Sequence, residues 1–498
     1  MKFEEKHLLT SPVLMDVMKI EKSLSFDDIL LIPRNTDLKR EDIDTTSRLT
    51  KNIELKVPIL SSPMDKVTGS EMAIAMAREG GLGVIHRNLD VDDQVNMVKK
   101  VKRSENWIIR NPYTVSPGIK ARKAKRIMQE KDISGLPVIE DGKLIGIVTK
   151  RDLRFETELQ KDVEEVMTSE LITAGPDTDI SQAKSILNKN KIEKLPLIDR
   201  KERLQGLITV RDIEKKKQHP QATLDENGQL MVGSAVGPDE LKRVEALVEA
   251  GVDLIVIDTA HGNSEDVIQA TKNVSESFDV DLMTGNIATA EGARALIDAG
   301  ADSLRVGIGP GSICTTRIVS GIGVPQITAI LNAYEAVQDE EVSVVADGGI
   351  RYSGDAAKAF ACGADSVMLG NMLAGTEEAP GRVVFRGGRK YKEYRGMASI
   401  SALEKREKNR YGQHFENREE YIPEGVEGLV PYKGTVSEVL HQIVGGLQSS
   451  MGHLGSKNIE DMRQGELYEI SEGGKRESHP HNVEITEDTP NYHWRGGR

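Results

Sequence analysis

A repeated unit in the second half of the chain constrains the fold more than any other feature. A segment with apolar residues at helical spacing ends in Gly-x-Asp, and a short apolar run follows at once. Helices are expected at 239–250, 290–299 and 354–362, and the apolar runs lie at 254–257, 304–306 and 366–369. Glycine commonly ends a helix, and continuous apolar runs of this length are typical of strands buried on both faces. Alternating helices and buried strands predict a parallel sheet.

Five more short apolar runs bring the expected number of strands to eight. They lie at 58–60, 82–85, 230–232, 281–283 and 342–346. Eight strands with helices between them predict an α/β fold, the (β/α)8 or TIM barrel, whose chemistry sits on the loops that follow the strands. Those loops carry glycine or polar residues here, at 61–65, 258–263, 285–286, 307–317, 347–349 and 370–371.

A second repeat interrupts the barrel between its second and third strands. Leu-Pro-Val-Ile at 136–139 recurs as Leu-Pro-Leu-Ile at 195–198, and Gly-Ile-Val-Thr at 146–149 recurs as Gly-Leu-Ile-Thr at 206–209. A spacing of about 60 residues indicates a tandem pair of small α/β units. We expect barrel segments at 1–110 and 218–498, with an insert at 111–217 whose halves are 111–160 and 165–217.

The insert resembles a pair of CBS domains. The resemblance implies that a threonine and an aspartate in each half contact adenine or guanine nucleotides, and these are Thr149, Asp152, Thr209 and Asp212. The alternative is that each aspartate only caps the helix that follows it.

The composition excludes several classes of protein. Two cysteines among 498 residues cannot build a disulfide framework, which fits a reducing, cytoplasmic setting. No apolar run approaches the length of a membrane span, so we expect no membrane association. A net charge of −13 and 4% aromatic residues argue against a dedicated nucleic-acid site. A local basic pocket for a phosphate stays compatible with this charge.

Cys314 is the strongest candidate for a reactive residue. It lies on a glycine-rich loop after the strand at 304–306, where glycines let the backbone approach a ligand closely. A thiol on such a loop is presented to a ligand, whereas a structural cysteine is normally buried in an element. The alternative is a small apolar filler. Cys362, on an apolar helix, is expected in the core.

Seven short motifs follow one another along the chain. They are Leu24-Ser25-Phe26-Asp27-Asp28, Ser61-Ser62-Pro63-Met64-Asp65, Gly311-Ser312-Ile313-Cys314-Thr315-Thr316, Ala346-Asp347-Gly348-Gly349, Tyr394-Arg395-Gly396-Met397, Asn409-Arg410-Tyr411 and Glu477-Ser478-His479-Pro480-His481. In this order, and with the CBS-like insert, they resemble the inosine-5′-monophosphate (IMP) dehydrogenase family. The resemblance covers the chain from end to end. It implies oxidation of IMP to XMP with reduction of NAD through a covalent Cys314 thioimidate, the first committed step of guanine nucleotide synthesis.

The resemblance also implies roles for individual residues. The catalytic residues would be Cys314, Thr316, Arg410 and Tyr411. The IMP contacts would be Ser62, Met64, Ser312, Asp347, Gly349, Gly370, Asn371, Tyr394, Gly396, Met397 and Glu424. The NAD contacts would be Asp258, Thr259, Asn286, Arg305 and Gly307, across the barrel mouth and without a Rossmann fingerprint.

Two of these assignments have competing explanations. Asp347 has the chemistry to accept both ribose hydroxyls, but it could simply cap a helix. Asp258 could be a solvated residue at the end of its strand. The chain departs from the family at Ala398, where the family usually has a second glycine and where an extra methyl group could crowd the nucleotide.

The densely charged segment 404–420 is typical of a solvated helix or loop. By resemblance it belongs to a mobile flap at about 398–430, in which Arg410 and Tyr411 activate water. An arginine is normally a permanent cation, so Arg410 acts as a base only in a strongly perturbed site, or else it orients water for another base.

His479-Pro480-His481 could be a metal pair, but no third ligand follows at a sensible spacing. The resemblance instead implies a monovalent cation (K⁺) site of backbone carbonyls. Gly309, Gly311 and Cys314 would supply one half, and Glu477, Ser478 and His479 of a neighbouring subunit the other. This implies a homotetramer and leaves open an octamer formed through the CBS pair.

Two other functions compete. GMP reductase shares the barrel and the Cys314 loop, but the insert and Asn409-Arg410-Tyr411 argue against it. A CBS nucleotide sensor on an inactive barrel is the second alternative, and intact Cys314, Asp347 and Arg410 argue against that.

Overall fold

The computed structural model describes residues 20–104, 109–110, 112–131, 133–154, 156, 158–210, 213, 219–410, 420–486 and 489–492, with the backbone alone at 406–410. Two compact units are present. The first comprises the residues up to Val101, Gln221–Thr223 and the residues from Met231 onward. The second comprises Lys102–Pro220 and Leu224–Leu230, which extends beyond the expected 111–217 on both sides.

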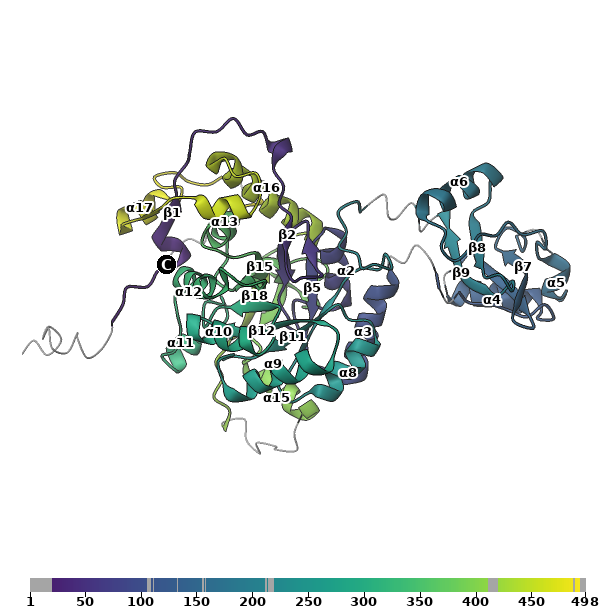
Figure 1. Cartoon of the computed structure of the whole chain (residues 1–498), viewed down its shortest axis with the longest axis horizontal. Coiled ribbons are helices and arrows are strands. Elements are labelled where there is room, and N and C mark those ends of the chain that lie inside the picture. Colours follow the sequence, from purple (N-terminus) through teal and green to yellow (C-terminus); the bar gives the residue numbers. More distant parts are fainter. Residues whose placement is uncertain are drawn as a thin grey trace, which may run out of the picture. The chain divides into compact units, whose positions relative to one another are not determined.

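The first unit contains the expected barrel of eight parallel strands (Figure 1). It closes in the order β10-β11-β12-β13-β14-β15-β4-β5. In chain order the strands are β4 (Ile59–Ser61), β5 (Leu82–Ile85), β10 (Gly233–Val236), β11 (Leu254–Asp258), β12 (Asp281–Ile287), β13 (Ser303–Val306), β14 (Ser343–Asp347) and β15 (Ser366–Leu369). The barrel prediction is therefore confirmed, including the return of β15 to β4 that closes it.

The third barrel strand was expected at 230–232, and this position is wrong because β10 comprises Gly233–Val236. Leu230 forms a bridge with Leu224 instead, and the strand begins at Gly233. The run Gly-Ser-Ala-Val did not look like a strand because its side chains are small. Small residues are needed there, since a Cβ on Gly233 would lie 3.2 Å from a methyl group of Val84 on the neighbouring strand.

Helices follow the barrel strands in the sequence, and the longer ones cover the outside of the barrel (Figure 1). They are α2 (Ser70–Arg78), α3 (Val91–Ser104), α8 (Leu241–Glu249), α9 (Glu265–Ser277), α10 (Ala290–Asp298), α11 (Thr316–Val319), α12 (Gln326–Val337), α13 (Ser353–Ala361) and α14 (Asn371–Ala374). The three expected glycine stops follow α8, α10 and α13. Gly251, Gly300 and Gly363 have φ values of +85°, +95° and +110°, which a side chain rarely allows.

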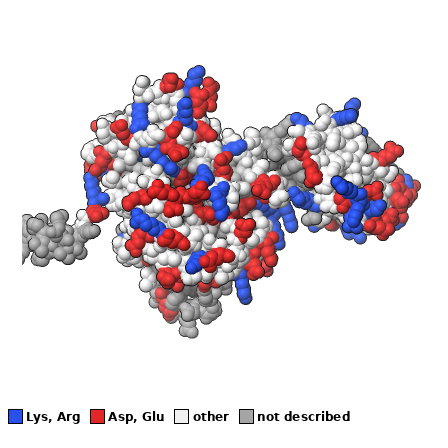
Figure 2. Space-filling model, viewed as in Figure 1, with Lys and Arg blue, Asp and Glu red and all other residues white. Residues whose placement is uncertain are grey.

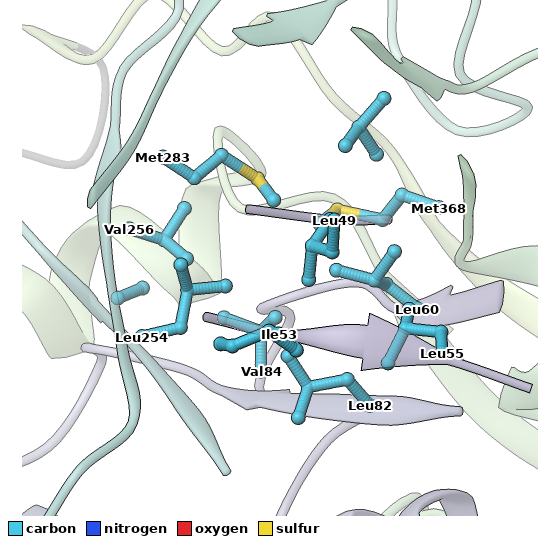
Figure 3. Packing of buried hydrophobic residues seen from close by; sticks show 12 residues of the cluster. Leu49, Ile53, Leu55, Leu60, Leu82, Val84, Leu254, Val256, Met283 and Met368 are labelled. Carbon is cyan, nitrogen blue, oxygen red and sulfur yellow. The ribbon is translucent and has the colours of Figure 1, made fainter. Parts of the chain in front are cut away.

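Apolar side chains fill the barrel interior. A hairpin of β2 (Ser47–Arg48) and β3 (Glu54–Leu55) inserts Leu49, Ile53 and Leu55 among residues from the strands, as Figure 3 shows. Met283 and Met368 belong to the same buried cluster. Because this end of the barrel is packed, a ligand has room only near the carboxyl ends of the strands.

Several elements lie outside the barrel strands. A three-stranded antiparallel sheet consists of β16 (Val383–Arg386), β17 (Arg389–Arg395) and β18 (Glu427–Pro431). Helix α15 (Ile400–Arg410) lies between β17 and β18 in the sequence. The strands β1 (Ile29–Leu31) and β19 (Leu467–Glu469) pair with each other. The remaining elements are η1 (Phe26–Asp28), η2 (Arg40–Asp42), α16 (Val436–Leu454), η4 (Glu460–Gln464) and α17 (Glu472–Glu477).

The second unit contains two copies of one motif. The first has α4 (Ala121–Glu130) and the hairpin of β6 (Gly135–Glu140) and β7 (Lys143–Thr149), followed by α5 (Val163–Val166). The second has α6 (Ile180–Asn190) and the hairpin of β8 (Lys194–Ile198) and β9 (Leu204–Thr209). Each copy has its own apolar cluster, and the strand register shifts at the same place in both hairpins. The repeat read from the sequence is thus a structural repeat.

Positive and negative side chains alternate over the visible face of the barrel unit, without a continuous basic patch (Figure 2). Among the helices that the structure describes, none is long and apolar enough to cross a membrane.

Candidate active site

A cavity of about 480 Å³ lies where the barrel strands end. Its walls come from the loops after β4, β11, β12, β13, β14 and β15, together with the end of β17 and the segment before β18. Every residue expected to contact IMP or NAD lines this cavity, and Cys314 and Thr316 line it too. Sequence positions spread over 360 residues thus converge because parallel strands end on one rim.

Cys314 is exposed and makes a short polar chain with two other side chains. Its Sγ lies 3.1 Å from the Thr316 hydroxyl, which donates to Glu424 Oε2 at 2.8 Å. The loop backbone holds this geometry, since Thr315 N donates to the Glu424 carbonyl at 2.9 Å. A thiol, a hydroxyl and a carboxylate in series can pass a proton from sulfur to oxygen.

Glycine is required where the Cys314 loop leaves β13. Gly307 has φ +146°, and a Cβ there would lie 3.0 Å from both side-chain amide atoms of Gln326. Gly309 has φ +76° and packs against Arg317. Arg317 donates to the Ile308 carbonyl at 3.2 Å and also to the Val324 carbonyl. The loop is therefore braced from inside by its own arginine.

Four neighbouring strands meet in a charged network beside the thiol. Arg305 on β13 donates through Nε to Asp347 Oδ2 at 2.9 Å and pairs with Asp258 through Nη1. Asn286 on β12 donates to Asp347 Oδ2 at 2.9 Å and to the Gly307 carbonyl at 2.9 Å. Burial lowers the pKa of the Arg305 guanidinium, but Asp347 and Asp258 outweigh that effect and raise it. The network keeps both carboxylates at the cavity wall.

Two buried acceptors at this wall have no partner among the described residues. They are Asn286 Oδ1 and Gln326 Oε1. Asn286 is 8% exposed and lines the cavity, so a ligand amide could donate to its oxygen. Together with the carboxylate of Asp258, which suits ribose hydroxyls, this donor and acceptor set fits a nicotinamide nucleotide.

The other side of the cavity is shaped for a nucleotide with a phosphate. Burial raises the pKa of Tyr394 to about 12 despite its hydrogen bond with Ser312, so its hydroxyl stays a donor. That hydroxyl points to Met64 Sδ at 3.7 Å. The remaining expected contacts on this side also line the cavity, namely Ser62, Gly349, Gly370, Asn371, Gly396 and Met397. Backbone amides of such glycine-rich turns suit a phosphate.

Ala398 lines the cavity as well, and its carbonyl accepts from Glu424 N at 3.1 Å. Its φ is not among the positive values of the described residues, so the methyl group adds no backbone strain. The departure from glycine therefore leaves the link between this turn and Glu424 in place.

A buried polar cluster lies at the root of the expected flap. Arg395 at the end of β17 pairs with Asp65 after β4, donates to Ser401 on α15 at 2.6 Å, and so joins the barrel rim to that helix. Desolvation raises the pKa of Asp65, but Arg395 outweighs this and holds it below its usual value. Burial lowers the pKa of the nearby His86 to about 4. The backbone of Arg410 ends α15, its side chain lies outside the described residues, and so does Tyr411.

The two halves of the expected cation site are not brought together within one chain. Glu477 ends α17, and His479 lies beside Tyr492, with Nδ1 3.2 Å from the tyrosine hydroxyl. No contact between 477–479 and the Cys314 loop is present in the described part of the chain. Nor do the described residues contain a cluster of three His, Cys, Asp or Glu side chains that could hold a metal. The site as expected needs a second copy of the chain.

Three residues at the cavity were missed in the sequence. Arg87, after β5, donates to the Asp258 carbonyl at 2.8 Å. Gln326 at the start of α12 donates to the carbonyls of Val306 and Asp347 at 2.8 and 3.1 Å. Polar residues at the end of a strand were the available signal for Arg87. No sequence signal distinguishes Gln326 or Arg317 from surface residues.

Comparison with known proteins now adds to this geometry. Residues 23–481 match the family model described as IMP dehydrogenase / GMP reductase domain. The chain belongs to this family. The inosine-5′-monophosphate dehydrogenase of Aquifex aeolicus is 52% identical, over 95% of this chain and 98% of that protein. The enzyme of the same name from Bacillus subtilis is 48% identical, over 95% of this chain and 98% of that protein.

A solved structure of a GMP reductase variant from Trypanosoma brucei, in complex with guanosine 5′-monophosphate, is also similar. It has a TM-score of 0.86 and 39% identity over 94% of this chain and all of that chain. An alignment of that extent includes most of the second unit. The argument that the insert speaks against a reductase is therefore wrong, because a family member named for the reductase shares this architecture. Sequence identity, higher to the dehydrogenases, is the better discriminator.

Proposed function

We propose that this chain is an IMP dehydrogenase, an NAD-dependent oxidoreductase that converts IMP to XMP. Relatives of that name are about half identical to it over nearly their whole length. The structural observation that carries the proposal is the chain from Cys314 through Thr316 to Glu424 beside the Asp347 network. These side chains line one nucleotide-sized cavity, and their order supports roles as nucleophile, proton relay and proton acceptor.

The first half of the reaction begins at Cys314. Its thiol proton passes through the Thr316 hydroxyl toward Glu424, and the thiolate attacks C2 of the hypoxanthine ring. Asp347 accepts hydrogen bonds from the ribose hydroxyls, and the backbone amides near Gly349, Gly370 and Asn371 hold the phosphate. These contacts fix C2 over the sulfur, and such positioning supplies much of the rate. NAD, when bound, accepts the hydride that leaves C2.

Asp258, Thr259, Asn286 and Gly307 would orient the nicotinamide half of the cofactor. Thr259 Oγ1 donates to the Gly285 carbonyl at 2.7 Å, which fixes the loop that carries it. Asn286 Oδ1 would accept from the carboxamide. Arg305 is already paired with two carboxylates, so we assign it to the wall of the cofactor site.

The second half is hydrolysis of the Cys314 thioimidate. Water adds to C2, the C–S bond breaks, and the products are XMP and the free thiol. Once its carboxyl group has released the Cys314 proton to solvent, Glu424 can take a proton from water through Thr316 and return it to the leaving sulfur. Arg410 and Tyr411 on the flap at about 398–430 would position or activate that water. Arg410 as an orienting cation, with Glu424 as the base, removes the difficulty of deprotonating an arginine.

We further infer that the second unit is a CBS pair that binds adenine or guanine nucleotides, with Thr149 and Asp152 in one half. Asp152 Oδ2 accepts from the amide and hydroxyl of Thr149, both at 2.7 Å, so it closes this turn and does not cap a helix. In the other half Thr209 ends β9, and Asp212 lies outside the described residues.

We also propose a homotetramer in the cytoplasm with K⁺ bound between two copies of the chain. The cation would contact the carbonyls of Gly309, Gly311 and Cys314 of one copy and those of Glu477, Ser478 and His479 of the other. Carbonyl oxygens suit a hard monovalent cation. Octamers formed through the second units are the larger assembly to test.

The activity test compares two reactions. With IMP and NAD we expect the absorbance of NADH to rise and XMP to form. With GMP and NADPH we expect no loss of NADPH. The reverse pattern would identify a GMP reductase, and nucleotide binding with neither reaction would identify a sensor on an inactive barrel.

A further inference from the structure

Arg305 joins two carboxylates that the proposed function gives to different ligands. Its Nε and Nη2 both lie 2.9 Å from Asp347 Oδ2, and its Nη1 pairs with Asp258 Oδ1. Asp347 ends β14, next to β13, whereas Asp258 ends β11, two strands away on the other side. One side chain therefore spans four consecutive strands of the barrel.

The bridge is buried and has little freedom. The Arg305 side chain is 8% exposed, against 14% for Asp347 and 18% for Asp258. A guanidinium is a rigid fork, so it holds two carboxylates at a fixed separation. Asp347 Oδ2 also accepts from Asn286, which leaves Oδ1 as the oxygen that faces a ligand. A ligand that binds Asp347 therefore contacts a carboxylate that is already linked to Asp258 through the Arg305 guanidinium.

We propose that Arg305 is a positioning residue that couples the IMP and NAD sites to each other. IMP bound at Asp347 fixes the guanidinium, and the guanidinium in turn holds Asp258 in the orientation that receives the cofactor ribose. The proposal rests on the proposed function. Coupling of two binding equilibria is reciprocal, so NAD must tighten IMP binding by the same factor as IMP tightens NAD binding.

Arg87 provides a matched control. It holds the same Asp258 from the β5 side, with Nη2 2.8 Å from the carbonyl and Nε 3.7 Å from Oδ2. Its Nη1 lies 3.9 Å from Glu240, so this arginine ties Asp258 to the wall of the barrel and not to the substrate carboxylate. Weakening Arg87 should disturb the cofactor site alone.

The experiment uses the full chain with Cys314→Ala, in which both nucleotides can bind without reacting. Calorimetry measures the affinity for IMP with and without saturating NAD, and the affinity for NAD with and without IMP. We expect each nucleotide to tighten the other at least about fivefold. Adding Arg305→Lys should reduce this factor at least about threefold, because an ammonium is a point charge that serves one carboxylate at a time. Arg87→Lys should weaken NAD binding and keep the factor.

Several results would overturn the proposal. One is the absence of coupling in the Cys314→Ala parent. Another is a folded Arg305→Lys variant in which the coupling factor falls by less than about threefold. If Arg305→Lys does not fold, Asp258→Asn breaks the bridge from its other end, and retained coupling there overturns the proposal equally. A parent that binds neither nucleotide removes the proposed function and the bridge with it. A parent that binds both without coupling removes the bridge alone.

Discussion

At the scale of single residues, the reactive thiol depends on a carboxylate from a distant part of the chain. Thr316 is a close neighbour of Cys314, but Glu424 lies 108 residues beyond Thr316. An isolated bridge between Cys314 and Gly425 draws the two segments together. The acceptor is thus fixed by backbone pairing, so the thiol needs no histidine beside it.

Cys314→Ser should abolish turnover and leave IMP binding within about twofold, because a hydroxyl ionises far less readily than a thiol of similar volume. NADH formation and IMP affinity measured on the same preparation check this. Appreciable NADH from the serine variant would exclude Cys314 as the nucleophile.

His86 predicts a pH dependence of stability. Burial lowers its pKa from about 6.5 to about 4. Below the unfolded pKa the unfolded chain therefore binds the proton and the folded chain does not, so stability falls as the pH falls from about 6.5 toward 4. The loss between about pH 7 and pH 5 is about 2 kcal/mol by this linkage.

His86→Gln should remove this part of the acid sensitivity, so its Tm should fall less than that of the wild type between the two pH values. The exposed His441 on α16 provides the control, since His441→Gln should leave the difference unchanged. Equal acid sensitivity in the His86 variant and the wild type would contradict the linkage.

The sequence could predict those site residues that directly follow a barrel strand. Asp258, Asn286 and Asp347 could be predicted at the cavity because each follows an apolar run, where a barrel places its chemistry, and all three line it. The pairing of Arg305 with two of them could not be found, since it depends on which strands become neighbours. The contact of Gln326 with the cavity wall could not be predicted for the same reason.

At the scale of elements, α15 is the helix whose last residue, Arg410, is expected to serve the water-activating step. Its first turn is tied to the rim through Ser401, Arg395 and Asp65. An element anchored at its root suits a segment that approaches the site at one stage of the reaction only.

Arg410→Ala should separate the two half-reactions. Attack by Cys314 and loss of hydride do not need the flap, whereas hydrolysis slows by about 10²–10⁴-fold when a water-positioning group is lost. Rapid mixing should show a burst of NADH near one equivalent per site, and mass spectrometry of the denatured protein should show an adduct on Cys314. A burst that vanishes together with turnover would place Arg410 in the first half-reaction.

Strand β5 illustrates how packing, and not propensity, selects a residue. Gly83 lies inside this strand, where a Cβ would come within 2.7 Å of Ala73 Cβ on α2 and closer still to its Cα. The sequence located β5 correctly but gave no reason for its glycine. The misplaced β10 has the same origin, because small residues at tight contacts hide a strand from an apolar pattern.

Gly83→Ala should lower the free energy of unfolding of the barrel by about 1–3 kcal/mol, the usual cost of overpacking. Gly354→Ala, in the first turn of α13, is the matched control. Nothing lies within 4 Å of its Cβ, so it should be neutral or stabilising by up to about 1 kcal/mol. Denaturant unfolding of both variants checks the difference, and equal effects would refute the packing argument.

At the scale of the whole molecule, the second unit interrupts the barrel without breaking it. The barrel keeps a short strap, Gln221–Thr223, inside the interrupting region. Thr223 donates its amide to the Ala77 carbonyl and its hydroxyl to the Gly81 carbonyl, both at 2.8 Å. The repeat in the sequence predicted an insert at 111–217, and the compact unit comprises Lys102–Pro220 and Leu224–Leu230. The strap has no apolar pattern that the sequence could reveal.

The segments that flank residues 105–219 lie close together within the second unit. Lys102 Nζ is 2.9 Å from Asp225 Oδ2, so a few residues can join the two segments. Removing 105–219 and joining the ends with about four glycine and serine residues should therefore leave the strap and the barrel folded. Turnover of IMP should stay within about threefold, because every described residue of the cavity belongs to the first unit.

Any effect of adenine or guanine nucleotides on rate or assembly should vanish in the shortened protein. Steady-state kinetics with and without ATP and GTP, together with sedimentation, test both statements. A shortened protein that folds and assembles but no longer oxidises IMP would make the second unit part of catalysis, and the separation of catalysis from regulation would be wrong.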